Sequence, residues 1–182
     1  MTLLPDVLPA GDIELRRWSP AYLDELMTVI ATSFSELQLW MPWAQTMPTA
    51  EEELGVLRAG EAAFEANRDW QYMLFEGHSG ELVGGAGLHN RIGTGGLEIG
   101  YWVHSDRTGR GYATSAAHAL VDAAFTYLAD VERIEIHMDI ANLASIAIPR
   151  KLGFQLLREE DREILAKGHT GRGLVWVLDR PT

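Results

Sequence analysis

A strand, a glycine-rich turn and a helix follow one another between residues 97 and 128, and this order constrains the fold more than any other stretch. Gly109 and Gly111 in the turn permit a tight backbone that presents amide N–H groups outward. Apolar residues then recur with the spacing of one helix face. A helix N-terminus has unpaired N–H donors and a positive dipole end, so we predict a phosphate or pyrophosphate site here. Taken alone, the segment also fits an ordinary structural turn.

The spacing in this turn argues against two commoner phosphate motifs. No Gly-Lys-Ser/Thr follows the glycines, which disfavours a P-loop, and no Gly-x-Gly-x-x-Gly occurs, which disfavours a dinucleotide fold. Arg107 and Arg110 would add positive charge beside the turn.

The composition fits one domain, residues 1–182, with 47% apolar and 23% charged residues. A net charge of -11 argues against nucleic acid or an anionic membrane as partner and suits a cationic or amine-bearing substrate. The absence of cysteine excludes disulfides, cysteine-bound zinc and a thiol nucleophile. No signal segment opens the chain and no apolar run reaches the ~20 residues of a membrane span, so we expect a cytoplasmic protein.

The first half of the chain predicts a strand at 13–18 and then a helix that begins at Ser19-Pro20. The segment 34–48 is rich in Trp and Met and contains two prolines, so we predict a packed loop or an aromatic wall of a binding pocket. Thr49 and Glu52 form a capping-box pattern that starts a second helix.

The second half predicts strands at 70–76, 82–90, 97–103, 133–140, 154–157 and 174–178. The run 133–140 alternates strictly, with isoleucine and methionine on one face and charged or polar residues on the other. Asn142 is placed to cap a helix that Gly153 ends. The predicted fold class is α/β.

Three blocks resemble the GNAT superfamily of acetyl-CoA-dependent N-acetyltransferases, most closely its ribosomal-protein N-terminal acetyltransferase branch, the RimJ/RimL type. They are Glu-Ile-Gly-Tyr-Trp-Val at 98–103, Thr-Gly-Arg-Gly-Tyr-Ala-Thr at 108–114, and Asn-Leu-Ala-Ser at 142–145 followed by Lys-Leu-Gly-Phe at 151–154. The resemblance implies a single-domain fold with a central, mixed, mostly antiparallel twisted sheet, a splayed gap for the acyl-CoA, and flanking helices.

The same resemblance implies acetyl-CoA as co-substrate, with the pyrophosphate on the glycine-rich turn and the pantetheine arm along 101–103, and no metal. The implied cofactor-binding residues are Tyr101, Trp102, Val103, Arg107, Thr108, Gly109, Arg110, Gly111, Tyr112, Ala113, Thr114, Asn142 and Ser145. Family members are often monomers or homodimers.

The chain departs from the family pattern at two positions. Thr108 stands where the turn often begins with Arg or Gln, and Arg107 is placed to supply that charge instead. Pro149 stands where many members carry a tyrosine that protonates the leaving thiolate. Proline cannot donate a proton, and inside a helix it removes a backbone hydrogen bond, so we expect no tyrosine acid there and a helix that is bent or starts late.

Acetyl transfer to an amine needs a proton acceptor, a polarised carbonyl and a stabilised thiolate, but no covalent enzyme intermediate. Glu98 is our first candidate base, His89 the second, and His137 a weaker third that also belongs to the substrate-binding set. Ser145 is the candidate partner of the thiolate, with helix capping as its alternative role. Trp40 and Trp43 are predicted to wall the acceptor pocket.

Three functions fit these residues. The first is acetylation of a protein N-terminal α-amine, and the second is acetylation of a small amine such as an amino acid, polyamine or antibiotic. The third is a coenzyme-A-binding module without catalysis, which only the missing tyrosine suggests. The resemblance favours the first of these.

Overall fold

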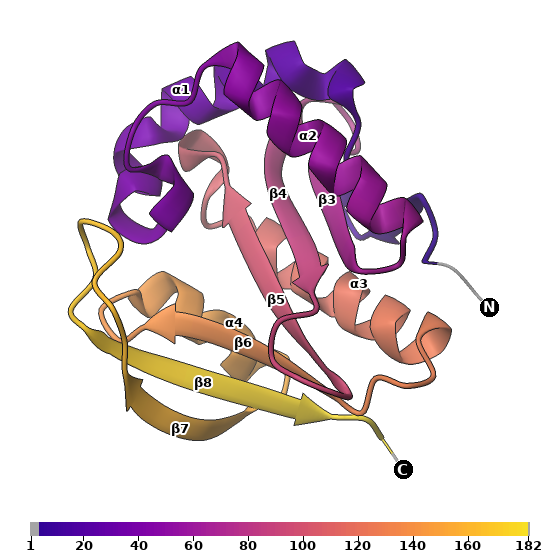
Figure 1. The fold of residues 1–182 in the computed structure, drawn as a ribbon, viewed down its shortest axis with the longest axis vertical. Helices are drawn as coiled ribbons and strands as arrows, with labels where there is room; N and C mark the ends of the chain where they lie inside the picture. The colour runs from indigo at the N-terminus through magenta and orange to yellow at the C-terminus, as the bar shows by residue number, and fades with distance from the viewer. Residues whose placement is uncertain (1–3, 182) are drawn as a thin grey trace.

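The computed structural model describes residues 4–181, which form one eight-stranded mixed sheet with helices on both faces (Figure 1). The strands are β1 (Val7–Ala10), β2 (Ile13–Arg17), β3 (Asp69–Glu76), β4 (Leu82–His89), β5 (Gly96–Val103), β6 (Arg133–Asp139), β7 (Gln155–Asp161) and β8 (Arg172–Asp179). The helices are α1 (Leu23–Trp40), α2 (Ala50–Glu65), α3 (Tyr112–Tyr127) and α4 (Leu143–Lys151), with short 3-10 turns η1 (Pro20–Tyr22), η2 (Pro42–Ala44) and η3 (Ser105–Arg107).

The strand order is β1-β2-β3-β4-β5-β6-β8-β7, and β5 with β6 is the parallel pair among antiparallel neighbours. The pairing of β5 with β6 ends at Ile99 and Ile136. Beyond that point β5 stays bonded to β4 as far as Val103, while β6 stays bonded to β8 as far as Asp139. The two strands therefore diverge, which confirms the predicted splayed gap.

Apolar side chains pack on both faces of this sheet. Alternate residues of β3 point to opposite sides, so Tyr72 joins a cluster with α3, whereas Met73 and Phe75 join one with α1 and α2. Figure 1 shows α1 and α2 on one side of the sheet and α3 on the other. Both faces are thus packed around β3 and β4, whereas β7 at the edge of the sheet is mostly exposed.

The prediction of a packed loop from residue 34 was wrong, because α1 continues to Trp40. Ser33 and Leu37 are buried and extend the apolar stripe of Leu26 and Ile30 at helical spacing. The helix ends just before Pro42, which begins η2. The many aromatic and Met residues hid this period in the sequence.

Several local predictions are confirmed. The Thr49 side chain accepts from the Glu52 backbone and Glu52 accepts from Thr49, so the capping box of α2 is complete. Asn142 caps α4, and Gly153 after it has φ +80°, the left-handed conformation that suits glycine. The helix α4 begins directly after its cap, so the expected late start does not occur, and Pro149 lies inside it.

The sequence analysis missed β1 and underestimated the lengths of β7 and β8. The residues of β1, VLPA, alternate between exposed and buried but are all apolar, and most of β7 is exposed, so neither strand shows a regular alternation of polar and apolar residues in the sequence. Within residues 4–181, no helix is long and apolar enough to cross a membrane.

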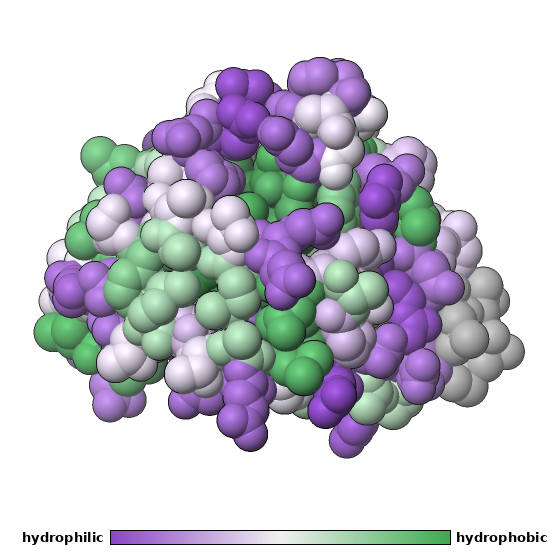
Figure 2. All heavy atoms as spheres, turned by 90° about the horizontal axis from the view of Figure 1, so that it is seen from above, coloured by the Kyte–Doolittle hydropathy of each residue, from purple (hydrophilic) through white to green (hydrophobic). Residues whose placement is uncertain are grey.

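Figure 2 looks onto the side that carries α1 and α2 and shows hydrophilic residues interspersed with separate hydrophobic groups.

Candidate functional site

Two cavities of 420 Å³ each meet where β5 and β6 diverge. We call the one lined by the turn at 107–111 the glycine-loop cavity, and the one lined by Glu98 and Asp139 the carboxylate cavity. The residues common to both linings are Trp40, Met41, Tyr101, Asn142 and Ser145. A molecule in one cavity can therefore reach a molecule in the other at this junction.

The glycine-loop cavity is bounded by the end of β5, the turn, the first residues of α3 and one side of α4. Every predicted cofactor-binding residue lines it except Arg110, whose guanidinium points to Glu76 instead. Arg107 does line it. Glu36 and Leu37 of α1, with Ala144, Ala147, Ile148 and Lys151 of α4, complete the wall and were not predicted.

Backbone N–H groups make this cavity a suitable anion site. None of the amides of residues 109–114 donates a hydrogen bond to another group within residues 4–181. Gly109 and Gly111 have φ of +75° and +85°, and a Cβ at either would meet nothing within 4 Å. A left-handed backbone beside open space, next to a helix N-terminus, fits a pyrophosphate.

A buried carboxylate ties the turn to the neighbouring hairpin. Glu76, at the end of β3, is 2% exposed and accepts from the Tyr112 hydroxyl, from Ser79 Oγ at 2.8 Å and from Arg110 Nη1 at 3.3 Å. Arg107 Nε lies 4.0 Å from the same carboxylate, and its Nη2 donates to Glu81 at 2.7 Å. The hydrogen bond from Tyr112, with that from Ser79, lowers the pKa of Glu76, so it stays ionised at neutral pH.

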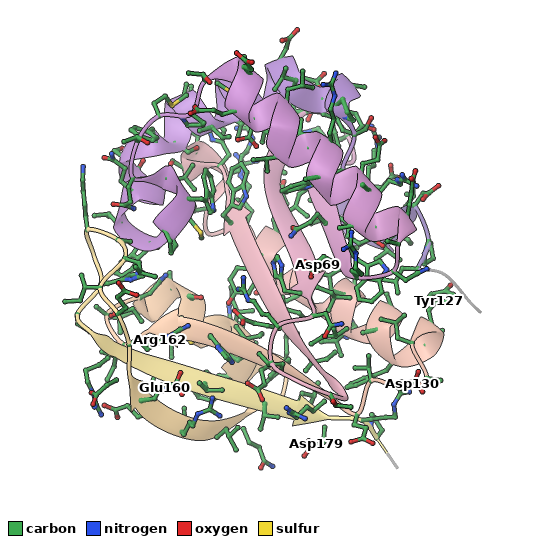
Figure 3. The ribbon with its side chains drawn as sticks, in the orientation of Figure 1. Asp69, Tyr127, Asp130, Glu160, Arg162 and Asp179 are labelled. Carbon is green, nitrogen blue, oxygen red and sulfur yellow. The ribbon has the colours of Figure 1, made fainter. Side chains whose placement is uncertain are left out.

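The carboxylate cavity is acidic. Five carboxylates (Glu98, Asp139, Glu160, Asp161 and Glu163) and two arginines (Arg91 and Arg162) line it, together with His137 and His169. In Figure 3, Glu160 and Arg162 lie together on the β7 side, away from Asp69. An excess of negative charge in a recess favours a protonated amine over an anion.

Glu98 is buried, at 7% exposure, and fully engaged by its neighbours. Arg91 donates to its two oxygens at 2.8 and 2.6 Å, and His137 Nδ1 lies 3.6 Å from Oε2. Burial alone would raise the pKa of Glu98, but the hydrogen bonds from Arg91 and the nearby positive charge lower it. Glu98 therefore remains a carboxylate at neutral pH, and it binds a proton less readily than an ordinary glutamate.

His137 sits between two buried carboxylates. Its Nε2 is 2.7 Å from Glu135 Oε2, while its Nδ1 faces Glu98 and the cavity. Burial opposes ionisation of Glu135, yet the hydrogen bonds from His137 and Arg133 lower its pKa. The alternating face predicted for β6 is thus polar but not exposed, because it lines the cavity at the divergence of the strands.

The structure places His89 outside both cavities. Its Nδ1 lies 3.2 Å from the Gln71 amide nitrogen and 3.8 Å from Asp69, and burial lowers its pKa. His89 is the cross-strand partner of Glu98, but its ring is directed toward Gly100 rather than to the junction.

Ser145 lies at the junction and contacts Tyr101, a residue predicted to lie along the pantetheine arm. The Tyr101 hydroxyl lies 2.9 Å from Ser145 Oγ and 3.3 Å from the Ser145 carbonyl, so its one hydrogen can be donated to either oxygen. Pro149 has no N–H to bond that carbonyl, which leaves it available. Burial raises the pKa of Tyr101 to about 12, so its hydroxyl remains protonated.

The two tryptophans have different surroundings. Trp40 lines both cavities. Trp43 lines neither; it is 45% exposed and packs edge-on against Trp102, with ring centroids 6.0 Å apart. Gly85 makes room for Trp102, because a Cβ there would lie 2.8 Å from the indole nitrogen.

The loop between β7 and β8 closes the carboxylate cavity and was not predicted to do so. Lys167 and Gly168 donate backbone N–H groups to the carbonyls of Gln38 and Leu39 at the end of α1. Asp139, at the end of β6, also fixes this loop, because its carboxylate accepts hydrogen bonds from the backbone N–H and the hydroxyl of Thr170. Within the described part of the chain, no group of three or more His, Asp or Glu side chains has the arrangement of a metal site.

Comparison with known proteins agrees with this geometry. The model of the family described as "Acetyltransferase (GNAT) domain" matches residues 12–155, so the chain belongs to the GNAT acetyltransferases. It is an N-acetyltransferase of the acetyl-CoA-dependent kind.

Several relatives resemble the chain in sequence or in fold. The chain is 27% identical to the putative ribosomal N-acetyltransferase YdaF of Bacillus subtilis over 151 residues, 78% of this chain and 77% of YdaF. The ribosomal alpha-N-protein acetyltransferase RimL in complex with coenzyme A superposes with a TM-score of 0.86 at 20% identity, covering 95% of this chain and 97% of RimL. RimJ of Mycobacterium smegmatis superposes at 0.82 and 24% identity, covering 94% and 84%. The chain therefore shares its fold with RimL and RimJ and is similar in sequence to YdaF.

Proposed function

We propose that this protein transfers the acetyl group of acetyl-CoA to the α-amine at the N-terminus of a protein in the cytoplasm. The observation that carries the proposal is the junction: an anion-binding cavity and an acidic cavity meet at Tyr101, Asn142 and Ser145. The names of the relatives YdaF and RimL support a ribosomal protein as acceptor.

The glycine-loop cavity suits the donor. Free amides at 109–114 and the start of α3 would bind the pyrophosphate, and Arg107 would add charge. The edge of β5 that β6 has left, at residues 101–103, would pair with the amides of the pantetheine arm. The thioester would then lie at the junction beside Ser145.

The carboxylate cavity suits the acceptor. Its surplus of carboxylates attracts a protonated amine, and Glu98 remains charged at neutral pH because Arg91 is bonded to it. Leu165, which is 47% exposed, lines the same cavity, and Ile164 beside it is 64% exposed. Apolar side chains at the rim favour an acceptor with residues beyond the amine.

For the proton of the amine, the geometry favours a division of roles between Glu98 and His137. Glu98 has a lowered pKa and both oxygens bonded, so it is suited to hold the amine and balance positive charge rather than to keep a proton. His137 presents Nδ1 to the cavity, and Glu135 fixes the opposite nitrogen. We assign the proton to His137 Nδ1, directly or through water.

For the leaving thiolate, Ser145 would donate a hydrogen bond from its hydroxyl to the sulfur. Tyr101 can donate to Ser145 Oγ at 2.9 Å, which directs the serine hydrogen away from the tyrosine and toward the junction. The C–S electron pair goes to sulfur and the amine forms the new C–N bond. Attack by the neutral amine needs no acyl-enzyme, which agrees with a chain that has no cysteine.

An acceptor panel tests the function. Purified protein and labelled acetyl-CoA are incubated with three sets: peptides with a free α-amine, the same peptides N-terminally blocked but carrying a lysine, and small amines such as spermidine and free amino acids. Transfer to the first set and not the second supports the proposal. Preferential acetylation of a small amine would show that the acceptor class is wrong, and coenzyme binding without any transfer would contradict catalysis.

A further inference from the structure

We propose that Glu76 is a positioning residue for the donor: it holds the glycine-rich turn in the shape that binds the pyrophosphate of acetyl-CoA. The inference rests on the proposed donor site. Glu76 lies on β3, outside the lining of both cavities, and has no part in the chemistry of transfer.

Three side chains of the turn and of α3 converge on this one carboxylate. Arg110 donates to Oε1 at 3.3 Å, Arg107 Nε lies 4.0 Å from it, and the Tyr112 hydroxyl donates to it. Tyr112 is the first residue of α3, so its ring, 7% exposed, fixes where the helix begins. The β3–β4 hairpin thereby holds both sides of the two glycines.

The turn needs an external anchor because its own backbone supplies little. Gly109 and Gly111 have high conformational freedom, and the amides of 109–114 make no hydrogen bond inside the described chain. Without Glu76 these amides would lose their common direction, and the donor would have to order them on binding.

The negative charge of Glu76 has a second effect on donor binding, which opposes the effect of the anchor. A carboxylate near the site repels a pyrophosphate, so removing it could also strengthen binding. Glu76 and Glu81 together balance Arg107 and Arg110, and each contributes one negative charge. Glu81 is 59% exposed and, of the three converging side chains, contacts only Arg107. Glu81→Gln therefore removes the same charge as Glu76→Gln but leaves the anchor in place.

The experiment compares Glu76→Gln with Glu81→Gln, using calorimetry for acetyl-CoA and steady-state kinetics for acetyl-CoA and S-acetylpantetheine, which lacks the pyrophosphate. We expect Glu76→Gln to weaken acetyl-CoA binding about 10-fold or more relative to Glu81→Gln, the range for a lost charge-assisted bond network. We expect kcat/KM for S-acetylpantetheine to be the same in both variants, and kcat with saturating acetyl-CoA to be unchanged.

Equal acetyl-CoA affinity in the two variants, or tighter binding by Glu76→Gln, would overturn the inference. If Glu76→Gln lowers kcat/KM for S-acetylpantetheine as much as it weakens acetyl-CoA binding, the inference is also overturned, because that pattern indicates general damage to the fold. If Glu76→Gln does not fold, Tyr112→Phe removes one bond to the carboxylate without changing charge, and we expect weaker acetyl-CoA binding there too. A parent protein that binds no acetyl-CoA would overturn the proposed function itself, whereas the variant comparison leaves that function standing.

Discussion

The two cavities that meet at Ser145 are built in different ways. The glycine-loop cavity takes most of its anion-binding groups from one continuous stretch, residues 107–114, and uses backbone N–H groups. The carboxylate cavity takes its side chains from α1, β5, β6, α4, the end of β7, the segment after β7 and Arg91 after β4. Backbone sites depend on conformation and tolerate changes of most side chains, whereas a site of convergent side chains depends on each residue. The two cavities should therefore respond differently to mutation.

The largest effect is expected in the glycine-loop cavity from Gly111→Asp. The substitution forces a Cβ onto a residue with φ +85° and places a negative charge where the pyrophosphate binds. We expect acetyl-CoA affinity to fall about 100-fold or more, as measured by calorimetry. Gly93→Asp is the matched control, because Gly93 has φ +92° and open space but lies outside both cavities. Unchanged affinity in folded Gly111→Asp would place the donor elsewhere.

In the carboxylate cavity we expect His137→Gln to lower kcat about 10- to 100-fold, with acetyl-CoA affinity intact. Steady-state kinetics measure this, and a kcat in His137→Gln equal to that of the parent would exclude His137 as the proton acceptor. Glu98 titrates below the ordinary glutamate range of ~4.3, because Arg91 lowers its pKa.

Glu98→Gln should therefore raise the KM for the amine more than it lowers kcat. If kcat collapses in Glu98→Gln while His137→Gln keeps the full rate, Glu98 is the base, as the sequence first indicated.

At the junction, Ser145→Ala should lower kcat roughly 5- to 150-fold, the effect of losing a hydrogen bond of about 1–3 kcal/mol to a charged atom. Tyr101→Phe should lower it less, and the double variant should be no slower than Ser145→Ala, because both act through one hydroxyl. The Tyr101 hydroxyl stays protonated below its pKa of about 12, so Tyr101→Phe should keep the parent pH profile. If the losses of kcat in the two single variants add up in the double variant, Ser145 and Tyr101 act independently and not through one hydroxyl.

The smallest effect is expected at the rim of the carboxylate cavity. Glu163→Gln removes one charge that lines it, so the KM for a cationic acceptor should rise about two- to three-fold, less so at high salt. Acetyl-CoA affinity should not change. A loss of donor affinity instead would mean that the two cavities are not separable.

The contrast also explains how much could be predicted from the sequence. The strand, turn and helix around Gly109 and Gly111 and the capping box at Thr49 follow local rules, so their places were predicted and are confirmed. The divergence of β5 from β6 was implied by the family resemblance and is also confirmed. The helical period of residues 34–40 was masked by Trp, Met and the nearby prolines, and α1 was cut short in the prediction.

The contacts within the junction could not be predicted, because they join residues far apart in the chain. Pro149 was correctly taken to exclude a tyrosine at its own position, yet the hydroxyl that contacts Ser145 comes from Tyr101, 44 residues earlier. The bond from Arg91 to Glu98 and the placing of His137 against Glu135 likewise depend on strand register and side-chain direction. The position of the loop at 162–171 could not be predicted either, because it depends on hydrogen bonds to the end of α1.

The central claim is that donor and acceptor occupy separate cavities that meet at Ser145. The most direct test is the affinity of a conjugate in which the sulfur of coenzyme A is joined through an acetyl linker to the α-amine of a peptide. If both cavities are filled at once, the conjugate should bind about 10²- to 10⁴-fold more tightly than coenzyme A or the peptide alone. Gly111→Asp and His137→Gln should each reduce that gain. A conjugate that binds no more tightly than coenzyme A would contradict the account.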